Sequence, residues 1–420
     1  MKSPSATRAA AVIAALALTV AACGGDDDDD TATTDPAGTA AGAPATEAPG
    51  TEAPGTAAPG TEAPGTDSPT SEAPTEECTD LTPVKLQLQW FAQAQFAGYY
   101  AAVDQGFYEA QCLDVEILEG GVDIVPHTVL ASGEADFAIS WVSKALAGRE
   151  AGADITNIAQ VFQRSGTLQV SWADSGIDSP EDFAGKKIGN WGFGNEYEIF
   201  AALGQAGLDP ASDVELVAQN FDMLGLLNRE IDAAEAMTYN EYAQLLEAVN
   251  PDTGELYTPE DFTVINYSEI GVGMLQDAIW ADESRLADDP EYFDTAVRFV
   301  AASLEGWAFC RDNVEACVDI TLAAGPTLGT SHQTWQMNEI NKLIWPSPEG
   351  AGFIVEADWS NTVELSLSTP NLEGATVLTA EPTEGAFTND IVTAAWELLG
   401  DDFADDEYTP IDVELVEGGA

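Results

Sequence analysis

Short apolar strands alternate with amphipathic helices from residue 84 onward, and this alternation restricts the fold more than any other feature. Apolar and polar residues alternate in residues 84–90, which predicts a strand, and residues 96–108 have the apolar spacing of a helix. Further strands are expected at 113–118, 135–140, 155–162 and 167–172, with helices at 124–132 and 144–148. Strand–helix–strand order is typical of parallel βαβ units, so the sequence predicts an α/β fold.

A second unit of the same kind begins at Ser179. Ser179 takes the N-cap position, Pro180 the first helical position, and two acids follow, which together mark a helix start. Strands are then predicted at 187–189, 214–217 and 232–237, with helices at 197–206, 223–228 and 240–248. Beyond residue 290 the predicted elements are helices, at 291–309, 314–324 and 390–399.

The folded part of the chain is too long for one hydrophobic core, so two lobes are expected. The order of elements predicts residues 81–173 and 271–370 for lobe one, 174–270 for lobe two, and 371–420 for an acidic C-terminal extension. The chain should cross between the lobes near residues 171–177 and 265–273. This topology suits a binding protein that closes about a hinge.

The N-terminus has the pattern of an export signal. Lys2 and Arg8 precede the apolar run 9–20, which is too short to span a bilayer. The small residues before Cys23 resemble a bacterial lipobox, which implies cleavage after residue 22 and a lipid on the Cys23 sulfur. An ordinary secretory signal with an incidental cysteine is the alternative. We expect residues 1–22 to be a lipoprotein signal peptide and the mature chain to be anchored on the extracytoplasmic face of a bacterial cell membrane.

Residues 23–80 carry no apolar face that a core could bury. An unbroken run of aspartates occupies residues 26–30, and residues 46–66 repeat Thr-Glu-Ala-Pro-Gly with one altered unit. Acidic segments rich in proline and glycine stay disordered because they cannot offset the entropy of folding. We therefore expect a disordered tether between the lipid anchor and the lobes.

Composition excludes several classes of partner. The chain has 73 acidic against 13 basic residues, a net charge of −60, which argues against nucleic acids and anionic membrane surfaces and disfavours a strongly anionic ligand. Adaptation of an exported surface to salt or low pI explains most of this charge. The two histidines, His127 and His332, have no cysteine or histidine at zinc-finger spacing, so neither a metal nor a cofactor is expected.

Five cysteines are present, and lipidation of Cys23 leaves four. An even number of cysteines in an exported chain suggests disulfides, and three pairings are possible. We favour Cys310–Cys317, which are close in sequence across a predicted helix–turn–helix, and Cys78–Cys112, which would attach the tether to lobe one.

A glycine-spaced turn follows the predicted strand 187–189. Gly192 and Gly194 allow the backbone to bend and a ligand to approach it, beside the aromatic face of Trp191 and the carboxylate of Glu196. A turn at the carboxyl end of a strand is where open α/β sheets bind ligands. The alternative is an ordinary βα turn with one aromatic side chain in the core.

The candidate ligand contacts are aromatic and polar side chains close to predicted strand ends. They are Trp90, Gln93, Gln95, Phe96, Tyr99, Ser140, Trp141, Asn190, Trp191, Gly194, Asn195, Glu196, Tyr239 and Asn240, and Phe193 and Gln163 are further possibilities. Core packing is the alternative role for each aromatic. Aromatic faces combined with amide and carboxylate edges suit a flat, neutral or weakly basic heterocycle.

Five segments carry a resemblance to a known family. They are residues 86–108, 113–118, 130–136, 183–189 and 236–242. In these the chain resembles the ABC-transporter substrate-binding proteins that are related to thiamine-pyrimidine synthases and sulfonate-binding proteins. The resemblance implies a type II periplasmic-binding-protein fold, with two lobes joined by a two-strand hinge. It also implies delivery of a small solute to an ABC permease. We favour a thiamine pyrimidine precursor or a riboflavin-like ring as that solute.

The same family has an enzyme branch, which makes the thiamine pyrimidine from pyridoxal phosphate and histidine. Ser140 stands where that branch has its Schiff-base lysine, Lys144 where it has a metal-binding histidine, and residues 271–276 contain no cysteine. A serine cannot form the imine. We therefore expect a binding protein and not an enzyme, while a thiamine pyrimidine synthase and a sulfonate- or nitrate-binding protein stay as alternatives.

Overall fold

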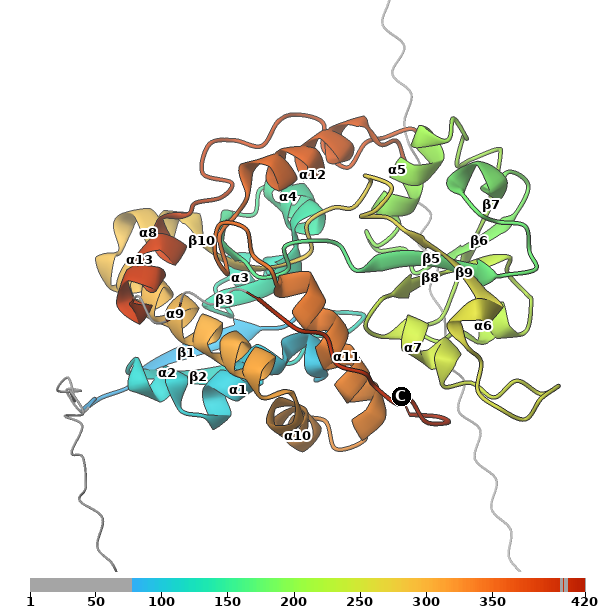
Figure 1. The fold of residues 1–420 in the computed structure, drawn as a ribbon. Coiled ribbons are helices and arrows are strands. Elements are labelled where there is room, and N and C mark those ends of the chain that lie inside the picture. The colour runs from blue at the N-terminus through green and yellow to red at the C-terminus, as the bar shows by residue number, and fades with distance from the viewer. Residues whose placement is uncertain (1–77, 401–402, 404–406, 420) are drawn as a thin grey trace, which may run out of the picture. The chain divides into compact units, whose positions relative to one another are not determined.

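The computed structural model describes residues 78–400, 403 and 407–419, so the predicted signal peptide, the lipidated Cys23 and almost all of the tether lie outside the described residues. The described chain contains two five-stranded sheets, in the orders β2-β1-β3-β10-β4 and β7-β6-β8-β5-β9. Figure 1 shows one sheet in each of two lobes. In both sheets the fourth strand, β10 or β5, runs antiparallel to its neighbours. The α/β class expected from the alternation is confirmed.

The first sheet lies in lobe one and is built from two separate stretches of the chain. Its strands are β1 (Thr82–Gln87), β2 (Leu113–Leu118), β3 (Phe137–Trp141), β4 (Ile155–Gln160) and β10 (Asp277–Asp282). The helical segments between the first four strands are η1 (Ala94–Phe96), α1 (Ala97–Asp104), α2 (Phe107–Ala110), α3 (Pro126–Ala131) and α4 (Val142–Glu150).

The second sheet lies in lobe two and comes from one continuous stretch. Its strands are β5 (Thr167–Trp172), β6 (Lys187–Asn190), β7 (Glu215–Ala218), β8 (Ala233–Met237) and β9 (Phe262–Asn266). Its helical segments are η2 (Pro180–Phe183), α5 (Tyr197–Gln205), α6 (Leu224–Leu227), α7 (Glu241–Leu246) and η3 (Pro259–Asp261). Ser179 and Asp182 form the capping box at η2, at the helix start predicted there.

The rest of the chain returns to lobe one as helices. They are α8 (Glu283–Asp288), α9 (Pro290–Asp312), α10 (Val314–Ala324), α11 (Thr330–Ile344), α12 (Glu356–Ser368) and α13 (Asp390–Leu399). The strands β9 and β10 and the helices α8, α11 and α12 were not predicted. Five of the six β10 residues are buried, so the strand shows none of the alternation that reveals a half-exposed strand.

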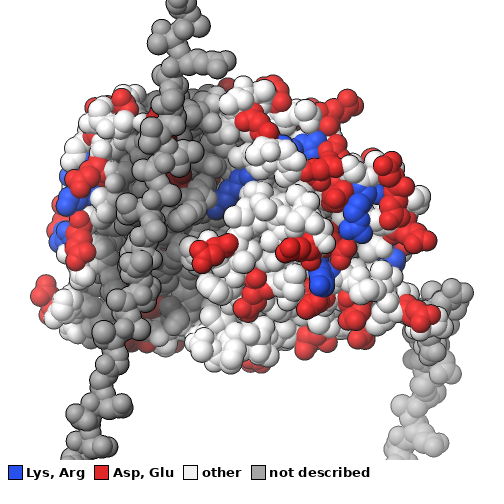
Figure 2. Space-filling view, turned by 180° about the vertical axis from the view of Figure 1, so that it is seen from behind, with Lys and Arg blue, Asp and Glu red and all other residues white. Residues whose placement is uncertain are grey.

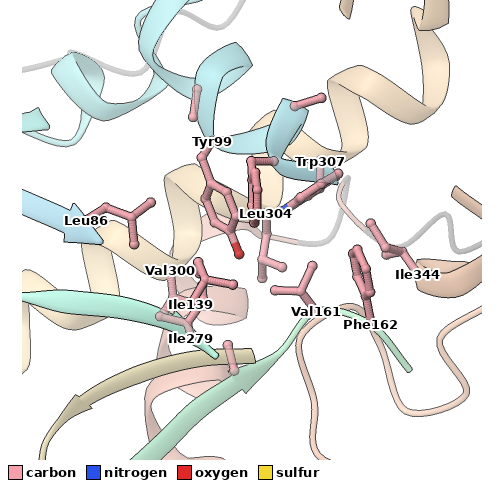
Figure 3. Packing of buried hydrophobic residues seen from close by; sticks show 14 of the residues in the cluster. Leu86, Tyr99, Ile139, Val161, Phe162, Ile279, Val300, Leu304, Trp307 and Ile344 are labelled. Atoms are coloured by element: carbon pink, nitrogen blue, oxygen red, sulfur yellow. The ribbon is translucent and has the colours of Figure 1, made fainter. Parts of the chain in front are cut away.

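The packing of α9 on α1 organises the core of lobe one. A Cβ atom built on Gly98 would lie 2.2 Å from the Trp307 ring, so only glycine lets the two helices approach this closely. Trp307 packs edge-on against Tyr99 at 5.5 Å, and Figure 3 shows Val300 and Leu304 of α9 in the same cluster.

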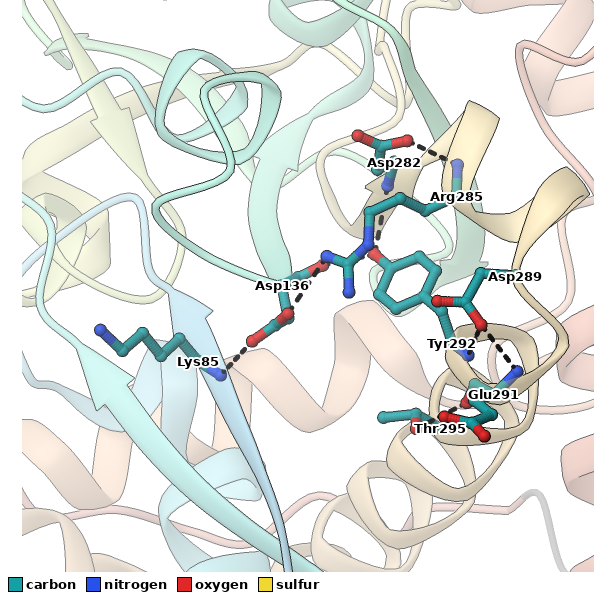
Figure 4. Close-up of polar contacts among 8 residues, drawn as sticks. All are labelled: Lys85, Asp136, Asp282, Arg285, Asp289, Glu291, Tyr292 and Thr295. Atoms are coloured by element: carbon teal, nitrogen blue, oxygen red, sulfur yellow. Dashed lines mark hydrogen bonds and ion pairs between the residues drawn. The ribbon is translucent and has the colours of Figure 1, made fainter.

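A polar cluster ties β3 to the start of α9 (Figure 4). Arg285 pairs with Asp136 at 3.2 Å and lies 3.8 Å above the ring of Tyr292. The Tyr292 hydroxyl donates to the Asp136 carbonyl, and the Lys85 amide donates to the Asp136 carboxylate. These contacts surround the residue that precedes β3, so they fix the amino-terminal end of the strand whose carboxyl end enters the candidate site.

The crossings between the lobes differ in part from the prediction. Because β5 belongs to the second sheet, the first crossing is residues 161–166 and not 171–177, and lobe one ends before Thr167. The second crossing, residues 267–276, overlaps the predicted 265–273. Both connections lie between strands and are not strands themselves, so the expected two-strand hinge is not present in that form.

The predicted C-terminal extension is part of the folded body instead. Residue 386 accepts a hydrogen bond from the Asn157 amide of β4, and α13 packs against α9. Residues 407–419, which we call the C-terminal strap, run along α11 toward lobe two, as the dark red end of the chain shows in Figure 1. The Asn338 side-chain oxygen accepts hydrogen bonds from the Tyr408 hydroxyl and the Ile411 amide, and the Gly418 amide donates to Glu247 beyond α7.

Two disulfides join the described cysteines. Cys78–Cys112 fixes the start of the described chain beside β2, and Cys310–Cys317 joins the end of α9 to α10. These are the two pairs favoured from the sequence.

The surface is strongly acidic. Figure 2 shows Asp and Glu side chains spread over the visible face, with few Lys and Arg side chains among them. Within the described residues, no helix has the length and apolar character required to cross a bilayer.

The strap should contribute to stability because it attaches to both lobes. We expect removal of residues 407–420 to lower the free energy of unfolding by about 1–3 kcal/mol, since hydrogen bonds to Asn338 and the partly buried Leu415 are lost. Urea unfolding of the truncated and full-length chains measures this. Glu417→Gln, on an exposed strap residue, is the matched control. Equal unfolding midpoints for truncated and intact protein would contradict the expectation.

Candidate ligand-binding site

A cavity of about 360 Å³ lies between the two lobes. Lobe one lines it with the segments that follow β1, β2 and β3, and lobe two with those that follow β6, β7 and β8. Each sheet therefore contributes the carboxyl ends of three parallel strands. Open α/β sheets bind ligands at this position, and here both sheets present their strand ends to the same cavity.

Aromatic side chains from both lobes form the walls of the cavity. Trp90 of lobe one and Phe221 of lobe two have ring centroids 4.7 Å apart, and Trp191 stacks on Phe221 at 6.0 Å with an interplanar angle of 18°. Trp141, Phe193, Tyr197 and Tyr239 also line it. Stacked and offset faces of this kind bind flat apolar rings.

The buried Asp277 orients the side chains on the lobe-one side. Its carboxylate accepts hydrogen bonds from Gln89 at 2.5 Å, from Gln95 at 2.9 Å and from the Trp141 indole at 2.8 Å. Burial raises the pKa of Asp277 to about 7, against these hydrogen bonds, which favour the ionised form. All three donors line the cavity, so one buried carboxylate fixes much of its polar wall.

Glu235 has the corresponding role in lobe two. It lies within β8 and is fully buried, and its carboxylate accepts a hydrogen bond from the Trp191 amide at 2.9 Å. Gln219 bonds to both the amide and the carbonyl of Glu235, which joins β8 to the end of β7. Burial raises the pKa of Glu235 well above its ordinary value. This carboxyl therefore holds the first residue of the glycine-spaced turn after β6.

Lys144 reaches the cavity from the first turn of α4. Its ammonium donates to the Asn195 side-chain oxygen at 2.7 Å and lies 4.2 Å from the centre of the Trp141 ring. Asn195 belongs to lobe two, so this hydrogen bond joins the lobes. Burial lowers the pKa of Lys144 to about 8, although the surrounding carboxylates, led by Glu235, act in the opposite direction.

A polar edge is formed by the start of α7. The Glu241 carboxylate accepts hydrogen bonds from the Met237 amide and the Asn240 side chain, and burial raises its pKa to about 7. The Asn240 side-chain oxygen lies 2.8 Å from Nε2 of His332, whose Nδ1 lies 3.1 Å from the Glu247 carboxylate. The buried His332 on α11 thus positions the Asn240 side chain from the side away from the cavity.

The structure brings together most of the residues proposed from the sequence. The cavity is lined by Trp90, Gln93, Gln95, Ser140, Trp141, Trp191, Asn195, Tyr239 and Asn240. Gly194 borders a small adjoining cavity of about 10 Å³.

Besides Gly194, which lines only the small adjoining cavity, four proposed residues line neither cavity. Phe96 and Tyr99 are fully buried in the lobe-one core, because η1 packs against α10 and α11, and α1 packs against α9 and α10. Asn190 is the last residue of β6 and is buried beneath the turn. The Glu196 carboxylate accepts a hydrogen bond from the Gly194 amide, so it shapes the turn. We withdraw these four as direct ligand contacts.

Several lining residues were missed by the sequence reasoning. They are Gln89, Lys144, Ala147, Gly148, Tyr197, Phe221, Met237, Glu241 and the loop 121–127 with His127. Phe221 and the loop both follow predicted strands, so the strand-end rule could have found them. From the sequence, Lys144 was considered only as the position of the enzyme branch's histidine, whereas α4 begins at residue 142 and directs its first turn into the cleft.

Two facing lobes with a cleft at the strand ends are the architecture of periplasmic binding proteins, and solved structures support this class. A periplasmic protein assigned to a sulfonate ABC transporter of Methylobacillus flagellatus superposes with a TM-score of 0.55 at 17% identity, covering 80% of this chain and 99% of that chain. The alkanesulfonate-binding protein SsuA of Xanthomonas axonopodis gives a TM-score of 0.50 at 12% identity, covering 70% and 96%. The protein has the periplasmic-binding-protein fold.

The family follows from the sequence comparison. The family model described as NMT1/THI5 like matches residues 93–316, and the chain belongs to this family. A formylaminopyrimidine-binding protein of Halalkalibacterium halodurans is 22% identical over 243 residues, which are 58% of this chain and 70% of the relative. The riboflavin-binding protein RibY of Chloroflexus aurantiacus is 26% identical over 325 residues, which are 74% and 86%.

The buried carboxyls should make stability fall as the pH rises. Burial raises the pKa of Glu198, Glu241 and Asp277 to about 7, so the folded protein retains protons that the unfolded chain has already lost. Their contribution to the free energy of unfolding is complete below about pH 4 and is lost as the pH rises through 7. Between these values each titrating carboxyl lowers the free energy of unfolding by about 1.4 kcal/mol per pH unit. Urea unfolding at intervals from pH 5 to 7.5 measures the slope.

Glu198→Gln isolates one of these groups. One Glu198 oxygen accepts from the Met274 amide, a bond that glutamine preserves, so the variant should give a shallower slope. Exposed Glu417→Gln should leave the slope unchanged. An equal slope in the Glu198→Gln variant would show that this carboxyl is not the cause.

Proposed function

We propose that the chain is the solute-binding component of an ABC importer, held at the extracytoplasmic face of the membrane through a lipid on Cys23. Its ligand is a small flat heterocycle of the pyrimidine or flavin type. The observation that carries the proposal is the aromatic cavity at the carboxyl ends of both sheets, with its wall of buried amides. The pyrimidine and riboflavin named for the two relatives agree with this chemistry.

The polar groups favour a heterocycle over a sulfonate. Among the described residues of the cavity lining, Lys144 is the one lysine and no arginine is present. Its ammonium already bonds to Asn195 and lies among buried carboxyls, which oppose a bound anion. Amide and carboxyl edges from Gln93, Asn240 and Glu241 can pair with the ring nitrogens and exocyclic groups of a heterocycle.

Closure of the lobes would couple binding to a change in shape. Residues 161–166 and 267–276 are the two connections about which the lobes can move. The Trp90–Phe221 contact and the Lys144–Asn195 hydrogen bond each join one residue of lobe one to one of lobe two. A ring bound between the lobes adds contacts that exist only when the lobes are closed, so it shifts the population toward the closed form.

Thermal unfolding with candidate ligands tests the proposal on the chain from residue 23 with Cys23→Ser. Formylaminopyrimidine or riboflavin should raise the unfolding temperature, since a ligand at a hundred times its Kd stabilises the folded state by about 2.7 kcal/mol. Trp191→Ala should weaken binding about tenfold or more because a stacking face is lost. Phe293→Ala, at an exposed aromatic of α9 that does not line the cavity, is the control. A shift with taurine alone would contradict the heterocycle.

The enzyme alternative has its own test. Lys144 carries an amine in the cavity with a lowered pKa, which favours imine formation with an aldehyde. Mixing with pyridoxal phosphate should give no stable imine absorbance, because Lys144 is engaged with Asn195 and Trp141. An imine band that Lys144→Ala removes would support the synthase instead.

A further inference from the structure

The turn after β6 holds an aromatic residue in a backbone conformation that aromatics avoid. Gly192, Phe193 and Gly194 have φ angles of 70°, 55° and 85°, so three consecutive residues are left-handed. Glycine adopts this region freely, but a bulky side chain there is strained. A smaller residue at position 193 would form the same turn at lower cost, so the presence of phenylalanine requires a reason.

The other strained residues have visible compensation. Within the described chain, Cys112 and Arg229 are the remaining non-glycine residues with positive φ. Cys112 is held by its disulfide with Cys78, and Arg229 pairs with Asp174 and lies over the Trp172 ring. Phe193, in contrast, is 81% exposed, the highest value among the exposed large hydrophobic side chains of the described residues. Core packing therefore does not explain it.

The turn is fixed by hydrogen bonds that include one from the opposite lobe. The Asn195 backbone and side-chain amides both donate to the Gly192 carbonyl, and the Gly194 amide donates to Glu196. Lys144 of lobe one bonds to the Asn195 side-chain oxygen. A Cβ atom on Gly194 would lie 3.2 Å from Lys144, so the lobes approach closely here. The position of Phe193 is thus tied to lobe closure.

Phe193 belongs to an apolar rim around the cavity. It lines the cavity, and so do Val122, Ile124 and Val125 in the loop after β2 of lobe one. All four side chains are exposed. The Trp191 and Phe221 pair lies on the same lobe-two wall. Exposed apolar groups that surround a ligand cavity indicate a surface that the ligand covers.

We propose that Phe193 is a specificity-determining contact that covers the part of an aromatic ligand extending beyond the Trp191–Phe221 pair. This proposal rests on the proposed function and restricts the class of heterocycle that the site binds. A single six-membered ring would occupy the stacking pair and leave the rim in water. A fused, multi-ring heterocycle would cover both. A fused aromatic system of the flavin type is therefore the ligand class that uses the whole surface, whereas a lone pyrimidine would bind at the Trp191–Phe221 pair without Phe193.

Binding and stability measurements on position 193 test the proposal in the chain from residue 23 with Cys23→Ser. The probes are riboflavin, its fused ring without the ribityl chain (lumichrome), and formylaminopyrimidine. Phe193→Ala should weaken binding of both fused rings about tenfold and leave pyrimidine binding unchanged. Phe193→Gly should weaken fused-ring binding as much as Phe193→Ala does. The urea unfolding midpoint of the Phe193→Gly variant should nevertheless lie above that of the parent chain, because glycine relieves the backbone strain at position 193.

Leu224→Ala is the matched control, since Leu224 is exposed in the same lobe and does not line the cavity. It should bind all three probes as the parent chain does. Unchanged riboflavin and lumichrome affinity in Phe193→Ala, with Trp191→Ala still weakened, would overturn the role of Phe193 alone. An equal loss of pyrimidine binding in Phe193→Ala would overturn the fused-ring class. A parent chain that binds none of the probes would overturn the proposed function, and this inference with it.

Discussion

Two buried carboxyls, Asp277 in β10 and Glu235 in β8, hold the walls of the cavity in place. Burying a carboxyl is costly unless donors surround it. Asp277 has three side-chain donors, and Glu235 has the Trp191 amide. These donors are themselves cavity residues, so the same hydrogen bonds that make burial tolerable also orient the site. Each lobe thus carries one acid behind its own wall.

Polar and aromatic contacts join the lobes at several separate places. The Lys144–Asn195 hydrogen bond and the Trp90–Phe221 contact lie at the cavity, whereas His332 meets Asn240 and Glu247 beside it. The C-terminal strap adds a hydrogen bond to Glu247. A ligand that bridges both walls of the cavity would add further contacts between the lobes and so would favour the closed form.

The sequence predicted the parallel βα units well, because their half-buried elements alternate visibly. It located β5 and β8 closely and pointed to the turn after β6. It missed β10, since a strand buried on both faces has no alternation, and it placed the first crossing after β5 because a strand pattern does not reveal which sheet the strand joins. The role of Phe96 was wrong for a related reason. An aromatic near a strand end can turn into the core or the cleft, and the direction depends on the helix packed against it.

By itself the sequence determined the α/β class, the acidic composition, the family resemblance and the glycine-spaced turn with its aromatics, because these depend on local pattern and composition. Only the tertiary structure decided which strand ends meet. It brought Lys144 and Phe221 to the cavity, placed Asp277 behind one wall and Glu235 behind the other, and exposed Phe193 in a strained conformation. Those features depend on contacts between residues far apart in the chain, such as Gln89 with Asp277, and no local pattern encodes such a pairing.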